Sequence, residues 1–172
     1  ISMTREPAIG LLVGERLLVN THGMLGYAAM SSVTIRQMLE LFEHFIRLRI
    51  ALITARHEVH ADEVRLRFTE VLPLGDIRRP VLECVLLAVK NVLDFITMGS
   101  CRLGYVAFPF ERPDYAVLAE GLFKCEVRYG QSWAGFSMPP EQLDTPLKMA
   151  DPAAFQEAAL ICRRELDKLS AN

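Results

Sequence analysis

One acidic residue stands out because it lies in a strongly apolar segment. Glu83 belongs to the hydrophobic stretch Val81–Met98. A carboxylate is rarely buried unless a cation or a hydrogen-bond donor accompanies it. If Glu83 faces the interior, an amine ligand would supply the missing cation. If Glu83 instead shares a helical stripe with Lys90 and Asp94 that faces water, the three residues mark a solvated edge. The sequence leaves both interpretations open.

Aromatic side chains that carry a polar group are the second set of candidates. Tyr27, Tyr105 and Trp133 each lie in or beside a mainly apolar segment. A buried Tyr or Trp needs a partner for its hydroxyl or indole N–H, and ligand pockets combine apolar walls with a few such polar groups. We therefore name these three residues as candidate ligand contacts. The alternative is that they are ordinary core residues.

Basic residues near one predicted strand offer the opposite charge preference. His57 is a candidate contact for a ligand carboxylate, whereas the neighbouring Arg56 has an outward position as its alternative. His57 and His60 form an H-x-x-H pattern, but residues three apart on a strand point to opposite faces, which is poor geometry for joint metal ligation. We predict neither a metal site nor a cofactor.

The motifs of the common enzyme classes are missing from the sequence. There is no nucleophile elbow, no phosphate-binding loop, no G-x-G-x-x-G and no pair of carboxylates at a motif spacing. The net charge of −2 also argues against a basic stripe of the kind that neutralises a phosphate backbone. We therefore predict a non-enzyme that does not bind DNA through this chain. Because no run of 18 apolar residues lacks a charge, and because the first residues, Ile1–Pro7, carry charges and no secretory h-region, we expect a cytoplasmic protein without a membrane span.

Three segments give the clearest indications of the elements that hold these residues. The segment Ser31–Thr34 provides a cap before an amphipathic helix over Ile35–Leu48, whose apolar residues fall on one face. Alternating polar and apolar residues predict a hairpin of strands over Ala51–Val59 and Glu63–Val71. The segment Val81–Thr97 is predicted to be a long, largely buried helix, because it is apolar around most of its circumference.

The remaining segments complete an α+β pattern. Helices are predicted over Pro7–Leu17, Asp114–Leu122 and Pro152–Leu169, and strands over Gly23–Met30, Arg102–Phe108, Lys124–Tyr129 and Trp133–Met138. Adjacent strands argue against a doubly wound parallel sheet. We expect one α+β domain in which a mainly antiparallel sheet of about six short strands packs with about five helices.

The last predicted helix carries a regular apolar stripe. Its members recur at spacings of four, three, four and three residues: Phe155, Ala159, Cys162, Leu166 and Leu169. This spacing is typical of a short coiled-coil seam, and it predicts a dimerisation surface. An amphipathic helix that packs on its own domain would show the same stripe, so the pattern alone does not decide between the two.

Three collinear segments resemble one known family. The first, Gly10–Arg49, contains a G-x-L-G-Y element followed by S-S-x-T. The second, Leu66–Leu86, has a P-x-G loop before the long helix. The third, Phe123–Leu147, ends in L-D-x-P-L. Together they make the chain similar to the N-terminal effector-binding ("arabinose-binding" type) domain of AraC-family bacterial transcriptional regulators. Among such regulators it looks most like those of ornithine and other amino-acid or amine catabolism.

The resemblance implies a cytoplasmic, homodimeric sensor of a small-molecule effector, with an amino acid or amine favoured. Residues 1–150 would form the sensor and 151–172 a dimerisation or linker helix, and the DNA-binding helix-turn-helix domain would lie outside this chain. We expect the effector between the sheet and the Val81–Thr97 helix. Two alternatives stay open: an effector-free dimerisation module, which a filled core would favour, and a small α+β enzyme, which polar residues converging in a cleft would favour.

Overall fold

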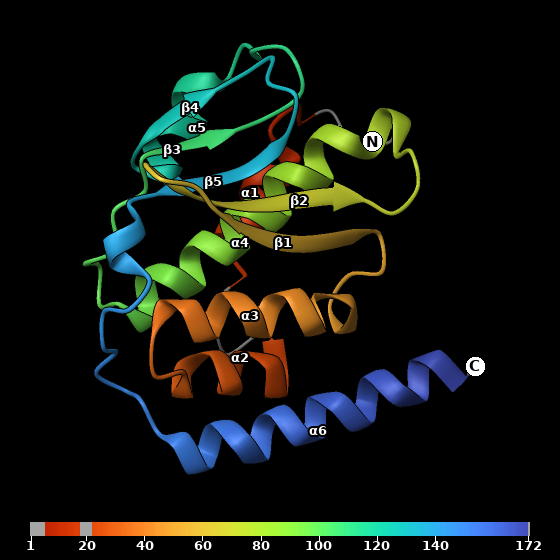
Figure 1. Ribbon diagram of the computed structural model, residues 1–172. Coiled ribbons are helices and arrows are strands. Elements are labelled where there is room, and N and C mark those ends of the chain that lie inside the picture. Colours follow the sequence, from red (N-terminus) through yellow and green to blue (C-terminus); the bar gives the residue numbers. More distant parts are fainter. Residues whose placement is uncertain (1–5, 18–21, 172) are drawn as a thin grey trace.

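The computed structural model describes residues 6–17 and 22–171, and it combines helices with one mixed sheet (Figure 1). The helices are α1 (Ile9–Glu15), α2 (Gly23–Ser31), α3 (Ile35–Phe45), α4 (Arg78–Ile96), α5 (Ala116–Phe123) and α6 (Pro152–Ala171). The strands are β1 (Ile53–Val59), β2 (Val64–Glu70), β3 (Tyr105–Ala107), β4 (Glu126–Arg128) and β5 (Ala134–Met138). Short 3-10 turns occupy Ile46–Leu48, Gly75–Ile77 and Pro140–Gln142.

The sheet has the strand order β1-β2-β5-β3-β4. Neighbouring strands are antiparallel except β3 and β4, which are parallel and are joined by α5 as a crossover. The predicted hairpin is confirmed as β1 and β2, with Val59 opposite Val64 at the turn. Since β5 pairs with both β2 and β3, the last strand in the sequence joins the two halves of the sheet.

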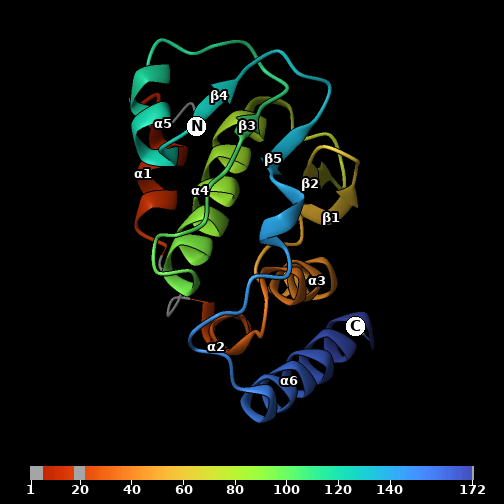
Figure 2. The same cartoon turned by 60° about the vertical axis from the view of Figure 1, so that its left-hand side comes forward.

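Helix α4 is the central element of the core. Figure 2 shows it between the sheet on one side and α1 and α5 on the other. Leu82, Leu86 and Leu93 are each at most 1 % exposed, and buried side chains occur around most of the helix. The inner face of the sheet, represented by Leu66 and Phe136, belongs to the same core. The prediction of a long, largely buried helix is confirmed.

Two glycines let α1 approach α4 very closely. A Cβ atom added at Gly10 would lie 2.3 Å from the backbone oxygen of Pro80, and one at Gly14 would lie 2.8 Å from that of Cys84. Neither distance is physically possible without a shift of the backbone, because these neighbours are main-chain atoms. The side chain of Asn91 also donates to the carbonyl of Gly14 at 3.1 Å. The α1–α4 contact is therefore made largely backbone to backbone.

The structure corrects one predicted element: residues 23–31 form helix α2, and the strand prediction over Gly23–Met30 is wrong. The helix packs against α6, α3 and α4, so Leu25, Ala28 and Ala29 are buried on more than one side. A helix that is buried on several sides has no polar face and thus no helical periodicity, and a short apolar run of this kind cannot be distinguished from a buried strand.

Helix α6 lies on the outside of α2, at the edge of the molecule (Figure 1). Asp151 caps its first turn, with the N–H of Ala154 donating to the carboxylate at 3.1 Å. Ala158 and Cys162 are fully buried against the rest of the chain. The C-terminal half of the helix extends beyond α2 (Figure 1), and Leu169 there is 57 % exposed.

The predicted α+β class and the mainly antiparallel sheet are confirmed. The sheet has five strands, one fewer than expected, because residues 23–31 are helical. The same segment makes six α-helices in the described residues rather than about five. In the part of the chain that the structure describes, no helix is both long and apolar enough to span a bilayer.

Candidate ligand-binding site

The structure brings two of the predicted aromatic residues together on the outer face of the sheet. Tyr105 in β3 and Trp133 just before β5 are 8 % and 6 % exposed, and with Ala107 they form a small apolar cluster separate from the main core. Their rings meet edge to face, with centroids 6.1 Å apart. This is the face opposite α4, so the two residues are buried by polar side chains and not by a helix.

Arginine side chains cover this aromatic cluster. The guanidinium carbon of Arg65 lies 4.6 Å from the centre of the Trp133 ring, and that of Arg67 lies 5.7 Å from it. The guanidinium carbon of Arg128 lies 3.7 Å from the centre of the Tyr105 ring. Each contact is a cation–π interaction, favourable by about 0.5–2 kcal/mol depending on how far it is removed from water. Two strands, β2 and β4, thus contribute three cations to one aromatic surface.

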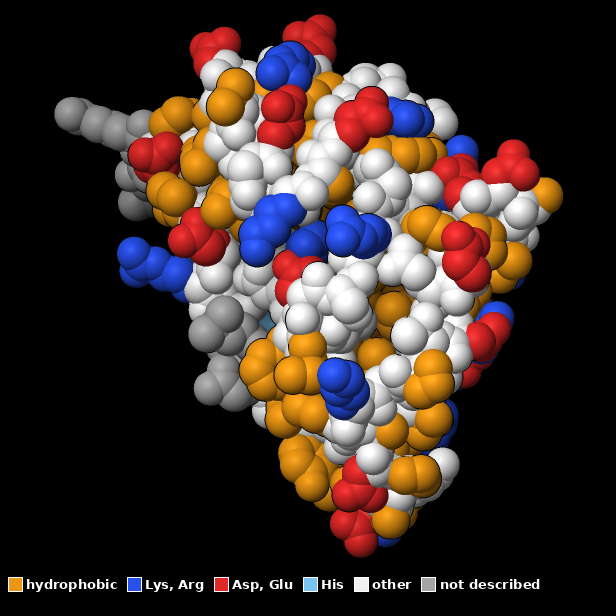
Figure 3. Space-filling view, turned by 90° about the vertical axis from the view of Figure 1, so that its left-hand side faces the viewer, with side chains coloured by type: hydrophobic (Ala, Val, Ile, Leu, Met, Phe, Trp, Pro, Cys, Tyr) orange, Lys and Arg blue, Asp and Glu red, His pale blue; other side chains and the backbone are white. Residues whose placement is uncertain are grey.

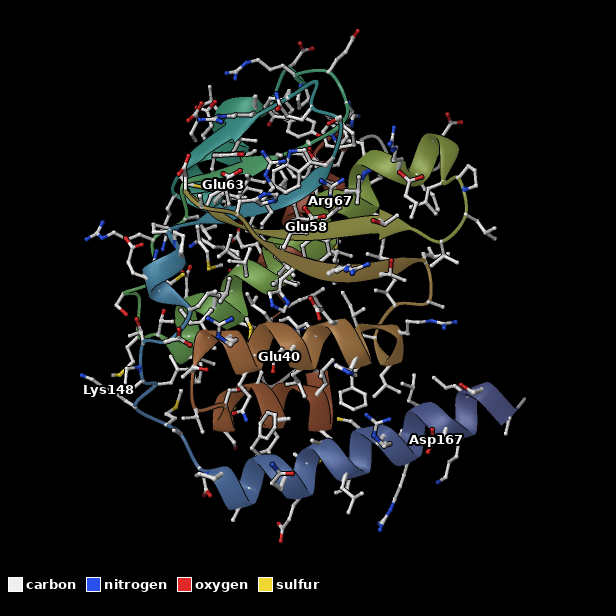
Figure 4. All side chains as sticks on the ribbon, in the orientation of Figure 1. Glu40, Glu58, Glu63, Arg67, Lys148 and Asp167 are labelled. Carbon is white, nitrogen blue, oxygen red and sulfur yellow. The ribbon has the colours of Figure 1, made fainter. Side chains whose placement is uncertain are left out.

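Two carboxylates balance the arginines. Glu63 accepts hydrogen bonds from Ser137 Oγ at 2.5 Å, Arg65 Nε at 2.5 Å and Tyr105 Oη at 3.1 Å. Burial alone would raise the pKa of Glu63, but these hydrogen bonds stabilise its charged form and hold the pKa below its usual value. Glu58 pairs with Arg67 at 3.1 Å. Figure 4 shows Glu58, Glu63 and Arg67 over this region of the sheet.

A cavity of about 300 Å³ opens beside this cluster, between the ends of β2 and β5 and the start of α4. The wall includes Arg67, Thr69, Glu70, Arg78, Ser132 and Trp133. Arg78 Nε pairs with the Glu70 carboxylate, which also accepts the backbone N–H of Leu74 at 3.2 Å. The wall therefore combines two cations, one anion, two hydroxyls and an indole.

One polar atom in this cavity wall lacks a satisfactory partner. Arg67 Nε is buried and makes no hydrogen bond of suitable geometry among the described residues, although Glu58 lies within ion-pair distance. An unsatisfied buried N–H costs about 1–3 kcal/mol, so the guanidinium of Arg67 is incompletely paired where its residue lines the cavity. Sequence reasoning missed Arg67, because alternation in β2 only places it on the polar face and says nothing of Trp133 above it.

Glu83 is buried, and the interpretation of a solvated edge is wrong. Its side chain is 0 % exposed, and both carboxylate oxygens lie 2.8 Å from the hydroxyl of Tyr115 in the segment before α5. Burial raises the pKa of Glu83 to about 7, against the hydrogen bond from Tyr115 and the charge of Arg79. Lys90 is also buried, paired with Asp94 at 2.6 Å.

A second tyrosine near Glu83 was also missed from the sequence. The hydroxyl of Tyr129 is buried and has no hydrogen-bond partner in the part of the chain that the structure describes. Burial, together with the charge of Glu83, raises the pKa of Tyr129 to about 12. Its ring stacks on Phe108, which in turn stacks on Phe110 at 4.8 Å. Tyr115 and Tyr129 come from loops that only the tertiary fold brings to α4.

The other predicted contacts lie elsewhere. His57 makes short contacts to the Glu43 carboxylate of α3, through both its ring Nδ1 and its backbone N–H. Tyr27 is 48 % exposed on α2. Arg56 is exposed, as its outward alternative required. The five predicted ligand contacts therefore fall into four places, and only Tyr105 and Trp133 share one.

The predicted stripe on α6 is mostly engaged within the chain. Phe155, Ala159, Cys162 and Leu166 are buried or half-buried, and α6 packs chiefly on α2 and to a smaller extent on α3. Leu169 is the exposed member of the stripe. Outside the stripe, Leu160 and Ile161 are 50 % and 36 % exposed.

The fold is that of a domain found in bacterial transcription regulators. A crystal structure of the transcriptional regulator CdpR from Pseudomonas aeruginosa superposes with a TM-score of 0.76 at 23 % identity, over 91 % of this chain and 51 % of that one. At that identity the likeness establishes the fold. It agrees with the predicted family as far as architecture is concerned.

The sequence gives the family. Residues 1–147 match the family described as the arabinose-binding domain of AraC transcription regulators, N-terminal, and the chain belongs to that family. The predicted resemblance is confirmed. The Ornithine utilization regulator of Pseudomonas aeruginosa is 28 % identical over 166 residues, which is 96 % of this chain and 48 % of that protein. The chain thus spans about half the length of the regulators that it matches.

Proposed function

We propose that this domain senses an amino acid in the cavity between the sheet and the start of α4. As a homodimer, it would pass the binding event to a DNA-binding domain. The observation that carries the proposal is the composition of the cavity wall, in which two cations, one anion, two hydroxyls and an indole surround about 300 Å³. Among the described residues, Arg67 Nε makes no hydrogen bond of suitable geometry, although Glu58 lies 3.1 Å from it. The family makes a regulatory role the natural context for such a cavity.

The charges favour an amino acid over a simple amine. A carboxylate would accept hydrogen bonds from Arg67 and Arg78, and a charge-assisted hydrogen bond is roughly twice as strong as a neutral one. An ammonium group would find Glu70 in the same wall. An amine without a carboxylate would use only Glu70 and would leave the Arg67 N–H unsatisfied. The volume lies at the small end of the range of roughly 300–1,000 Å³ for ligand pockets, which suits a metabolite of this size.

Binding regulates only if the effector prefers one of two conformations of the domain. A ligand shifts such an equilibrium by its difference in affinity between the two states. The cavity touches β2, β5 and α4, and α4 contacts α1, α2 and α5. A ligand that fixes the start of α4 against the sheet would therefore bias the packing of the helices behind it.

Trp133 provides the experimental signal, since it is the single tryptophan in the sequence. We expect L-ornithine to change its fluorescence saturably and to raise the Tm by several degrees at about 100 times its dissociation constant. Putrescine, which has the same chain with a hydrogen in place of the carboxylate, should bind at least about tenfold more weakly. Arginine, lysine and neutral amino acids complete the panel and identify the preferred side chain.

Two arginine variants test the site. Arg67→Gln should weaken ornithine binding by about tenfold or more, because it removes a charged donor from the cavity. Arg56→Gln is the matched control: it removes the same charge from the residue directly opposite Arg67 in β1, which is exposed and does not line the cavity. Equal affinities of the two variants would place the ligand elsewhere. A folded, dimeric protein that responds to no member of the panel would favour the effector-free dimerisation module.

The dimer part of the proposal concerns the exposed side of α6. Four of the five residues in the predicted stripe are buried or half-buried within the chain, which leaves Leu169 together with Ile161 to meet a second subunit. Two-fold pairing suits a regulator, because operators with two half-sites match a protein dimer.

A further inference from the structure

A second cavity, of about 110 Å³, lies among the helices on the other side of α4. Its wall is almost entirely apolar and is formed by α2, α3, α4 and the residues that flank them. The side chains that define it include Leu25, Phe42, Ile46, Val85, Val89 and Val92. It is separate from the cavity at the sheet, since the two have no lining residue in common.

Helix α4 keeps a trace of exposure where it faces this cavity. Val85, Ala88 and Val89 line it and are 9, 7 and 7 % exposed, whereas Val92, which also lines it, is 1 % exposed. The more open part of the space therefore lies beside residues 85–89 of the helix, and its wall is made mainly of aliphatic side chains.

Two polar side chains lie at its rim. Arg49, which is exposed, donates from Nε to Nδ1 of His22 at 3.3 Å. Burial, and then the charge of Arg49, lowers the pKa of His22. Because Nδ1 accepts the hydrogen bond from Arg49, the neutral imidazole carries its proton on Nε2. Among the described residues no carboxylate lies within ion-pair distance of Arg49. The rim thus presents N–H donors and a positive charge that no acid of the described chain neutralises.

We propose that this cavity binds a short aliphatic monocarboxylate. Its hydrocarbon chain occupies the space between α4 and α2–α3, and its carboxylate accepts hydrogen bonds from the free guanidinium N–H groups of Arg49 and from His22 Nε2. A cavity of about 150 Å³ holds one benzene molecule, so 110 Å³ suits a chain of about four carbons with the carboxylate outside. An amine of equal length would meet the charge of Arg49 and be repelled.

The position of the cavity gives such binding a regulatory meaning. Its walls include α2 and α3, the helices on which α6 packs. A ligand that fills the space would hold these two helices against α4 and so fix the support of α6. This site and its ligand class are independent of the amino-acid site at the sheet.

Isothermal titration calorimetry with three probes tests the proposal on the 172-residue chain. We expect pentanoate to bind saturably with a negative heat-capacity change, because apolar surface is buried. Pentylamine has a similar chain and the opposite charge, and acetate has the carboxylate without the chain. Both should bind at least about tenfold more weakly than pentanoate. Equal binding of pentanoate and pentylamine, or no pentanoate binding, would overturn the proposal.

Variants at the rim and in the wall of the cavity distinguish loss of ligand binding from loss of folding. Arg49→Gln should weaken pentanoate binding by at least about tenfold, whereas Arg47→Gln, which removes the same charge from a neighbouring exposed residue outside the cavity, should not. Ala88→Leu should fill the cavity and abolish binding. Unchanged affinity in Arg49→Gln would contradict the site even if Ala88→Leu fails to fold. The ornithine response of Trp133 should be the same in Arg49→Gln, so each proposal can fail without the other.

Discussion

The chemistry of single residues in this domain follows from what covers them. Tyr105 and Trp133 are buried beneath arginines on the outer face of the sheet, while Glu83 of α4 is buried and hydrogen-bonded to Tyr115. The sequence indicated that Glu83 lies in an apolar segment. It did not reveal that Tyr115 and Tyr129 lie near Glu83, because the residues around these tyrosines in the sequence do not indicate a contact with α4. A polar residue's partner comes from the tertiary fold, and the sequence of one element cannot supply it.

Glu83 should make the stability of the domain depend on pH. Its pKa is about 7 in the folded chain against 4.5 for the unperturbed group, so between these values the folded state keeps a proton that the unfolded state has lost. Stability is therefore lost as pH rises from about 4.5 to about 7. Relative to Glu83→Gln, which keeps an acceptor for Tyr115, the wild-type free energy of unfolding should fall by on the order of 2 kcal/mol over this range.

Urea unfolding at a series of pH values measures this difference. Glu157→Gln, an exposed substitution on α6, is the control and should run parallel to the wild type. If the Glu83→Gln curve is also parallel to the wild type, the pKa of Glu83 is not raised in the folded chain.

At the scale of elements, the amphipathic segments and the long apolar helix α4 were predictable, whereas the short apolar segment that forms α2 was not. The helix starting at Ile35 and the β1–β2 hairpin have one polar and one apolar face, and the structure places both as expected, with the N–H of Gln37 donating to the Thr34 cap at 3.2 Å. Helix α2 packs against α3, α4 and α6 and has no such pattern. Gly26, within the segment predicted as a strand, is buried in this helix.

The contact between α1 and α4 yields a prediction about two glycines. Gly10→Ala should destabilise the domain by about 2–3 kcal/mol, because the new methyl group would meet the Pro80 backbone and the two helices would have to separate. Gly121→Ala, in α5, meets nothing within 4 Å and should instead stabilise the domain by roughly 0.5–1 kcal/mol. Thermal unfolding followed by circular dichroism should therefore move the Tm in opposite directions for the two variants. A Gly10→Ala protein as stable as the wild type would show that the helices are not held at this distance.

At the scale of the whole molecule, a core of helices and sheet carries one long helix on its edge. The sequence predicted the family, and with it a regulatory domain, because three segments spread along the chain agree with one fold. It did not predict where space remains inside the fold, since cavities arise from the mutual placement of many side chains. On the end of the molecule seen in Figure 3, the coloured acidic and basic side chains are interspersed apart from a small basic group, and no basic stripe crosses that face.

The proposed dimer can be tested on α6. The wild-type domain should sediment as a dimer, and Ile161→Glu combined with Leu169→Glu should sediment as a monomer with an unchanged circular dichroism spectrum, because both side chains are exposed. Leu118→Glu, at an exposed leucine of α5, is the control and should remain dimeric in analytical ultracentrifugation. A monomeric wild type would remove the dimer from the proposal, and a dimeric double variant would move the interface to another surface.

The strand order has a consequence for how the domain forms during translation. β5 lies between β2 and β3 although it is the last strand to leave the ribosome. Until residues 134–138 have emerged, β2 and β3 each present an edge of unpaired backbone groups, and exposed edges of this kind invite pairing with other chains. The hairpin of β1 and β2 must therefore wait for more than sixty further residues before its sheet is complete. A nascent chain of this domain should be most prone to aggregation in that interval, after α4 has been made and before β5 arrives.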